Sequence, residues 1–137
     1  MKNSDFFIIL KGCNKYNMSD KKILLCEDSE IDSMAYSLYF TDKGFDVSVL
    51  ASTNNPNYIL KNLKRKIEEE NPDFVLIDGL EGECFKAIEI IPKRKNILPI
   101  IFSGDDDLVY EAKEKGYKAF NKIERDVLAE FLENYKN

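Results

Sequence analysis

Histidine and tryptophan are both absent from this chain of 137 residues, and cysteine, methionine and proline are scarce. Without histidine there is no Ser-His or Cys-His nucleophile pair, and a zinc site is not expected. The three cysteines, Cys13, Cys26 and Cys84, form neither a C-x-x-C pair nor an even disulfide set. We therefore expect reduced thiols, as in a cytoplasmic protein, and any bound metal to be a hard cation with oxygen ligands.

A surplus of positive charge and long apolar runs are missing as well. The net charge of −5 argues against nucleic acid as the main partner, because that affinity depends on lysine and arginine at the phosphates. Near the amino terminus only Phe6–Leu10 is apolar, which is too short for a signal-peptide core or a membrane span. We therefore expect neither nucleic acid nor a membrane as a partner.

The chain divides into a short amino-terminal segment and one folded domain. Residues 1–20 precede the repeating pattern described below, and they form either a loose leader or an extra edge strand at Phe6–Leu10. Residues 21–137 are enough for one domain that buries its own core.

From Lys22 onward, short apolar runs alternate with longer segments of helical period, which predicts βαβ units and a parallel sheet. The predicted strands are 22–26, 45–51, 74–77, 99–103 and 117–121, and the predicted helices are 30–43, 56–70, 83–95, 106–115 and 125–135. Ser29 can cap the first helix, and Gly44 can end it. The apolar face of the first helix comprises Ile31, Met34, Ala35, Leu38 and Tyr39, and that of the last comprises Val127, Leu128, Phe131, Leu132 and Tyr135.

Residues able to act on phosphate or metal follow four of the predicted strands. Glu27 and Asp28 follow the first strand, Asp78 the third, Ser103 ends the fourth, and Lys122 follows the fifth. The carboxyl ends of neighbouring parallel strands meet at one crevice, where open α/β sheets place their chemistry. The sequence therefore predicts one crevice with three acids, a hydroxyl and an amine.

This arrangement resembles the receiver domain of two-component response regulators over about residues 21–135. The segments that carry the resemblance are Ile23–Asp28, Pro72–Asp78, Leu98–Gly104 and Lys122. The resemblance implies a flavodoxin-like (βα)5 fold, with a doubly wound five-stranded parallel sheet in the order 2-1-3-4-5 and helices on both faces. It also implies a bacterial, cytoplasmic signalling protein that is a phosphoacceptor and not a dedicated enzyme.

The resemblance assigns a role to each residue of the crevice. Asp78 would accept a phosphoryl group from a histidine kinase or a phosphotransfer protein, and Ser103 and Lys122 would contact the transferred group. Mg²⁺ would be held by Glu27, Asp28, Asp78 and the backbone carbonyl of Leu80. Crowded carboxylates agree with this, because they repel one another and magnesium prefers oxygen ligands.

Two segments depart from the receiver pattern. The loop after Asp78, Gly79–Cys84, lacks the usual proline and is shorter. Lys122 is followed by Ile123 where receivers usually have a cis-proline, so either the bond is trans and the loop differs, or strain is stored there. The last strand is also one residue short, which places Ala119 where receivers have their switch aromatic, and Phe120 one position later.

Two functions of different classes follow. The first is a stand-alone receiver that is phosphorylated on Asp78 and signals by protein contacts through its fourth helix, fifth strand and last helix. The second is a pseudo-receiver that keeps the fold and binds a partner without phosphorylation. A flavin-binding protein of similar topology is not favoured, because acidic Glu27–Glu30 stands where a phosphate-cradling loop would be needed.

Overall fold

The computed structural model describes residues 21–94 and 96–136, so the expected leader 1–20 and its alternative edge strand lie outside the described residues. Five strands form one parallel sheet in the order β2-β1-β3-β4-β5. The doubly wound α/β fold predicted from the sequence is therefore confirmed. In chain order the strands are β1 (Lys22–Glu27), β2 (Asp46–Ala51), β3 (Phe74–Ile77), β4 (Leu98–Ser103) and β5 (Lys118–Asn121).

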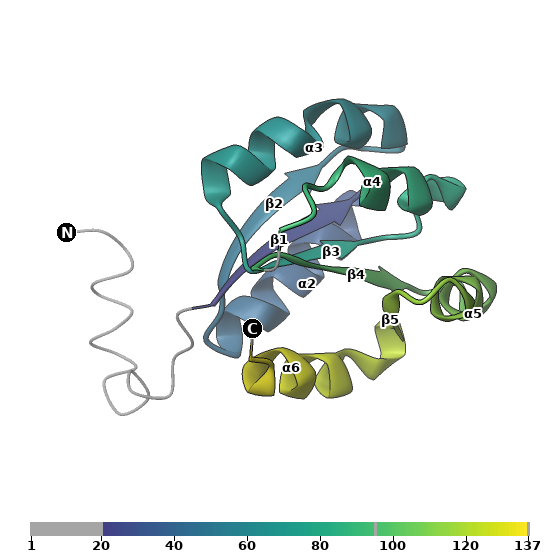
Figure 1. Ribbon diagram of the computed structural model, residues 1–137. Coiled ribbons are helices and arrows are strands. Elements are labelled where there is room, and N and C mark those ends of the chain that lie inside the picture. The colour runs from purple at the N-terminus through teal and green to yellow at the C-terminus, as the bar shows by residue number, and fades with distance from the viewer. Residues whose placement is uncertain (1–20, 95, 137) are drawn as a thin grey trace.

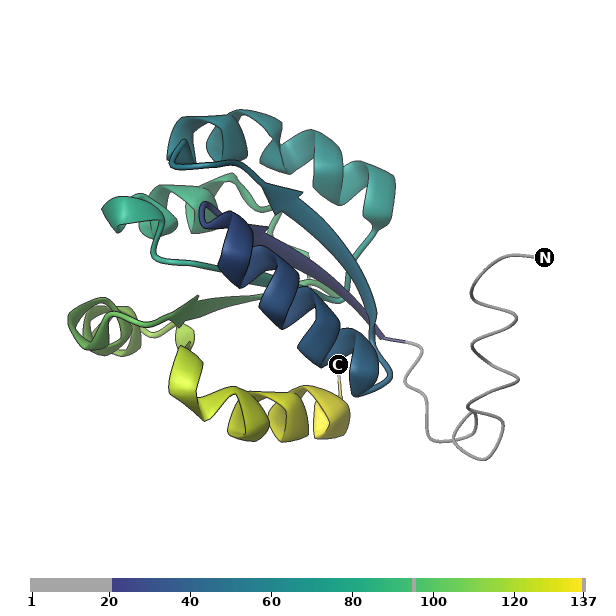
Figure 2. The ribbon, with the colours of Figure 1, turned by 180° about the vertical axis from the view of Figure 1, so that it is seen from behind.

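Helices cover both faces of the sheet (Figure 1 and Figure 2). One face carries α2 (Glu30–Asp42) and α6 (Arg125–Asn134), and the other carries α3 (Pro56–Glu70), α4 (Cys84–Ile90) and α5 (Asp106–Glu114). Side chains of a strand alternate between faces, so Ile23 and Leu25 pack in the first core layer and Leu24 and Cys26 in the second. Among the described residues, no helix is long and apolar enough to cross a membrane.

The helix boundaries largely follow the signals in the sequence. The Ser29 hydroxyl accepts the backbone N–H of Asp32 and caps α2, and Pro56 opens α3. The prediction for α4 was too long, because this helix ends at Ile90 and not at residue 95. Pro92 explains the difference, since the residue before a proline is held in extended backbone, as Ile91 is with ψ 128°.

The predicted inward face of α2 is wrong for four of its five residues, and only Tyr39 packs against the core. Ile31, Met34 and Leu38 are 79%, 61% and 69% exposed, and Ala35 is exposed too. The helix instead turns Ser33 and Phe40 into the core. Phe40 contacts the rings of Phe45 and Phe102 edge to face, so large aromatic side chains decide how the helix is rotated.

The last helix and the last strand differ less from expectation. In α6, Leu128 and Leu132 are buried as predicted, whereas Val127 is 56% exposed. In β5, Ala119 is buried beneath the layer of α3, α4 and α5, and Phe120 packs on the opposite face. Neighbouring residues of a strand point to opposite faces, so Ala119 and Phe120 lie in different core layers; the comparison with the receivers' switch aromatic stays a prediction.

Candidate functional site

The register of the sheet places the acids of β1 and β3 side by side. Cys26 lies opposite Ile77, and the backbone N–H of Asp78 donates to the carbonyl of Cys26 at 2.9 Å. Glu27 and Asp78, each the next residue along, therefore emerge together at the carboxyl edge of the sheet. Asp28 follows Glu27, and one oxygen of each of the three carboxyl groups lies within 4.8 Å of the others.

The other two strands bring the hydroxyl and the amine to the same edge. Ser103 lies opposite Asn121 at the ends of β4 and β5, and Lys122 comes next. Ser103 is buried, and its hydroxyl oxygen accepts the backbone N–H of Asp105 at 3.0 Å. It lies beside Gly79, since a Cβ added to that glycine would stand 3.1 Å from the Ser103 hydroxyl oxygen.

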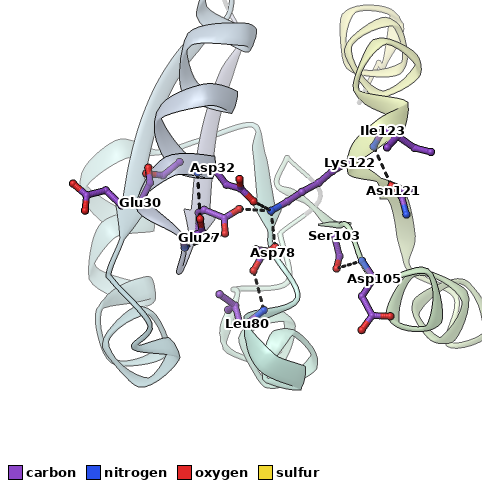
Figure 3. Close-up of polar contacts among 12 residues, drawn as sticks. Glu27, Glu30, Asp32, Asp78, Leu80, Ser103, Asp105, Asn121, Lys122 and Ile123 are labelled. Carbon is purple, nitrogen blue, oxygen red and sulfur yellow. Dashed lines mark hydrogen bonds and ion pairs between the residues drawn. The ribbon is translucent and has the colours of Figure 1, made fainter.

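The ammonium group of Lys122 is the centre of this edge (Figure 3). It lies 2.7 Å from a carboxylate oxygen of Glu27 and 2.8 Å from one of Asp78. A third contact, 2.8 Å to Asp32 in the first turn of α2, was not predicted from the sequence. The pairs with Glu27 and Asp78 are shielded from solvent far more than surface pairs are, whereas the Asp32 side chain is 40% exposed.

Burial, together with the neighbouring carboxyl groups, makes two of the acids weak. Burial, followed by the charge of Asp78, raises the pKa of Glu27 from 4.5 to about 7. Burial, followed by a hydrogen bond to Asp78, raises the pKa of Asp28 from 3.8 to about 6. Both carboxyl groups therefore hold protons more strongly than ordinary acids, although the Lys122 ammonium lies beside Glu27.

Asp78 is affected in the opposite direction. Burial opposes the ionisation of its carboxyl group, but the hydrogen bond and charge of Lys122 outweigh burial and lower its pKa. The backbone N–H of Leu80 donates to the second Asp78 oxygen at 3.2 Å and acts in the same sense. Asp78 is thus kept as a carboxylate, the form in which it is a nucleophile.

The donor set fits a hard divalent cation. Three clustered carboxyl groups, two of them with raised pKa values, supply the oxygen ligands and the excess of negative charge that Mg²⁺ neutralises. The backbone carbonyl of Leu80, the fourth predicted ligand, accepts the N–H of Glu83 at 2.9 Å. Its role toward a metal stays a prediction.

Known proteins resemble this chain in structure and not in sequence. No protein-family model and no curated protein matches it. A CheY-like receiver domain from Methanospirillum hungatei matches with a TM-score of 0.54 at 22% identity, over 84% of this chain and 93% of that one. The BeF3-activated receiver domain of Klebsiella pneumoniae RstA gives 0.56 at 17% identity, over 82% and 96%. A CheY-like receiver domain from Methylobacillus flagellatus gives 0.57 at 14% identity, over 76% and 86%.

These receiver domains match most of the described chain with TM-scores above 0.5, so the likeness is one of fold. The chain has the receiver-domain fold. Within that fold, the predicted site residues Glu27, Asp28, Asp78, Ser103 and Lys122 lie at the carboxyl edge of the sheet. The two segments that depart from the receiver pattern lie beside them.

The first departure is the loop after β3, which forms the 3-10 turn η2 (Leu80–Gly82). Leu80 and Glu81 both have positive φ, 51° and 54°, a conformation that costs side-chain-bearing residues about 1 kcal/mol each. The fully buried Leu80 side chain holds the turn to the core. The shortened loop thus keeps the Leu80 N–H on Asp78 at the expense of backbone strain.

The second departure follows Lys122. No peptide bond in the described residues is cis, so the Lys122–Ile123 bond is trans and the loop differs from that of a typical receiver. Lys122–Glu124 forms the 3-10 turn η3, in which the Asn121 side chain accepts the N–H of Ile123 and Glu124 accepts the N–H of Asn121. This reciprocal cap replaces the proline in directing Lys122 toward the acids.

Proposed function

We propose that this chain is a response regulator receiver that accepts a phosphoryl group on Asp78 from the phosphohistidine of a histidine kinase or phosphotransfer protein. The observation that supports it best is the placement of the Lys122 ammonium 2.8 Å from Asp78, beside the carboxyl cluster of Glu27 and Asp28. A carboxylate nucleophile, a fixed cation and a candidate metal site are the parts that phosphoryl transfer requires.

In the transfer, an Asp78 oxygen forms a new bond to phosphorus while the bond from phosphorus to the imidazole nitrogen breaks. The electron pair of the broken bond stays on the imidazole, which takes up a proton, and the product is an acyl phosphate on Asp78. Lys122 would stabilise the charge on the transferring oxygens, and its contact with Asp78 supports this role. The protein is then the phosphoacceptor and not a dedicated enzyme.

Glu27, Asp28 and Asp78 would hold Mg²⁺, with Leu80 as the further ligand expected from the family. Bound magnesium would neutralise charge on the phosphoryl oxygens and on the carboxyl cluster. Ser103 would donate its hydroxyl hydrogen to a phosphoryl oxygen of the product. Because its hydroxyl oxygen accepts the N–H of Asp105, that new bond would act on the loop leading to α5.

A downstream protein would recognise the phosphorylated state through the surface formed by α5, β5 and α6. A hollow of about 410 Å³ lies on this side of the molecule, lined by Lys113, Gly116, Tyr117, Lys118, Ala119, Phe120 and Glu124. Its residues Lys118–Phe120 belong to β5, which ends directly before Lys122, and Glu124 follows in the next turn, so a change at Lys122 would be close to the hollow. A downstream protein would bind there.

The donor would dock on the exposed apolar stripe of α2, formed by Ile31, Met34 and Leu38. Ile31 neighbours Asp32, whose carboxylate reaches into the site, so this stripe begins at the rim of the crevice. An apolar stripe beside a charged crevice fits a protein donor, because a small phosphodonor needs no such surface. Ile31→Asp should therefore abolish transfer from purified, autophosphorylated kinases that modify the wild type and leave modification by acetyl phosphate unchanged.

The decisive test of the proposed function is intact-mass measurement after incubation with acetyl phosphate and Mg²⁺. A single phosphate adduct is expected, and it should vanish in Asp78→Asn and without a divalent cation. Absence of an adduct under conditions that modify an established receiver domain would refute the proposal. The chain would then be a pseudo-receiver that binds its partner without phosphorylation.

A further inference from the structure

Lys122 contacts a carboxylate, that of Asp32, that has no part in the proposed phosphoryl transfer. Glu27 and Asp78 belong to the crevice, but Asp32 comes from the first turn of α2 and lies 2.8 Å from the ammonium nitrogen. The ring of Tyr36, one turn further along the same face of α2, has its centroid 5.4 Å from that nitrogen. This helix therefore supplies both an anion and an aromatic face to the same cation.

We propose that Asp32 and Tyr36 are positioning residues that hold the Lys122 ammonium in the crevice independently of Asp78. The inference rests on the proposed function, since it explains how Lys122 stays in place while Asp78 changes from carboxylate to acyl phosphate. It assigns no chemical step to either residue.

The number of donors on the ammonium supports this assignment. A lysine ammonium has three N–H donors, and three carboxylate oxygens lie 2.7 to 2.8 Å from the Lys122 nitrogen. Phosphorylation changes only the carboxylate of Asp78, whereas Glu27 and Asp32 keep theirs. Lys122 thus has two lasting anchors and one contact that can pass from Asp78 to a phosphoryl oxygen.

Both positioning residues are themselves held in place. The backbone N–H of Asp32 donates to the Ser29 hydroxyl at 3.3 Å in the helix cap. The Tyr36 ring meets Phe102 edge to face, with centroids 5.0 Å apart, and Phe102 directly precedes Ser103. Asp32 and Tyr36 are therefore held in place relative to β4, which carries Ser103.

A favourable interaction with the helix dipole is a simpler explanation for an acid in the first turn. Glu30 occupies the same turn and carries the same charge, but its carboxylate points away from Lys122 (Figure 3). Of these two first-turn acids, only Asp32 contacts the Lys122 ammonium. Glu30→Gln is therefore a matched control, because it removes a first-turn charge without touching Lys122.

The direct test is the Lys122 ammonium resonance in ¹H–¹⁵N NMR spectra of the full chain, assigned by its loss in Lys122→Gln. We expect the signal to be visible in the wild type, in Glu30→Gln and in Asp78→Asn, because two anchors remain in each. In the Asp78→Asn background, where Glu27 and Asp32 are the remaining carboxylate contacts, Asp32→Ala should broaden the signal beyond detection, and Asp32→Asn, which keeps an acceptor oxygen, should restore part of it. A Lys122 signal that is unchanged in a folded protein with both Asp78→Asn and Asp32→Ala would overturn the proposal.

Phosphorylation by acetyl phosphate gives a second readout. Asp32→Ala should lower the maximal rate about tenfold, with little change in the half-saturating concentration, and Asp32→Asn should recover part of that rate. A faster rate in both variants would overturn the positioning role, because Asp32 would then act only by repelling the anionic donor. If the wild type takes up no phosphate, the proposed function fails, whereas the NMR test of the Lys122 anchors still stands.

Discussion

Raising the pH from about 5 to about 8 without a divalent cation should destabilise the folded chain. Ordinary carboxyl groups are already ionised at pH 5, and the chain has no histidine to titrate in this range. Glu27 and Asp28 do titrate there, because their pKa values are raised to about 7 and about 6. Both carboxyl groups are neutral at the lower pH and are forced to ionise within the cluster at the higher one.

The sign follows from where the protons are held. The unfolded chain releases the Glu27 proton near pH 4.5 and the folded chain near pH 7, so the folded state binds more protons in between. Stability is therefore greatest at low pH and falls as the pH rises through this window. The effect of Asp78 has the opposite sign, because its pKa is lowered in the folded chain. The stability that Asp78 contributes is lost only as the pH falls below about 4, outside this window.

The size of the effect can be worked out from Glu27, whose side chain is only 1% exposed. The rise of its pKa from 4.5 to about 7 corresponds to about 3 kcal/mol, at about 1.4 kcal/mol for a tenfold change in proton affinity. Asp28 is nearer to solvent and adds less. A loss of about 3 kcal/mol is a large share of the roughly 5 to 15 kcal/mol that stabilises a typical domain.

Urea unfolding followed by circular dichroism at pH 5, 6.5 and 8 measures the effect. Mg²⁺ should restore most of the lost stability at pH 8 and little at pH 5, where it competes with protons for the same oxygens. Glu27→Gln should flatten the pH dependence and weaken the response to Mg²⁺. A metal-free wild type whose stability is constant or rises between pH 5 and pH 8 would refute the reasoning.

Substitutions at three further positions test the packing beside Ser103, the aromatic core and the end of α3. Gly79→Ala should slow phosphorylation by acetyl phosphate severalfold, because its Cβ would stand 2.7 Å from Leu108 and 3.1 Å from the Ser103 hydroxyl oxygen; an unchanged rate would contradict this placement. Phe40→Ala should cost about 3 to 5 kcal/mol of unfolding free energy in urea titrations, since Phe40 is fully buried against two aromatic rings. Asn71→Ala should cost about 1 kcal/mol and Asn71→Gly less in the same assay, because Asn71 ends α3 with φ 50°.

The sheet was predictable because its strands are short apolar runs bounded by polar residues, glycine or proline. In β3, all four residues are buried, as expected for a strand covered on both faces. The bounds of α3 match the prediction at both ends, where Pro56 begins the helix and Asn71 follows it. The predicted end of α4 is wrong because Pro92 stops the helix, which ends at Ile90.

The site was predictable where it depends on strand ends, and not where it depends on helix rotation. Glu27 and Asp78 meet because the sheet register brings them together, and the order of strands follows from the alternating pattern. Asp32 could not be singled out from the sequence, because an acid in the first turn of a helix has a local explanation in the cap and the dipole. Its contact with Lys122 connects residues 90 positions apart in the chain.

The wrong face predicted for α2 and the unpredicted role of Asp32 have one cause. Asp32, Tyr36 and Phe40 are four residues apart, so they share one side of the helix, and contacts with Lys122 and the aromatic core turn that side inward. Helical period then leaves Ile31 and Leu38 on the opposite side, in solvent. Burying the apolar stripe instead would rotate Asp32 away from Lys122 and expose Phe40. The helix therefore leaves apolar side chains exposed at the rim of the crevice, against the rule that the apolar face of a helix packs on the core. Such a departure from the sequence pattern is expected at a functional site, here the Lys122 contact and the proposed docking surface.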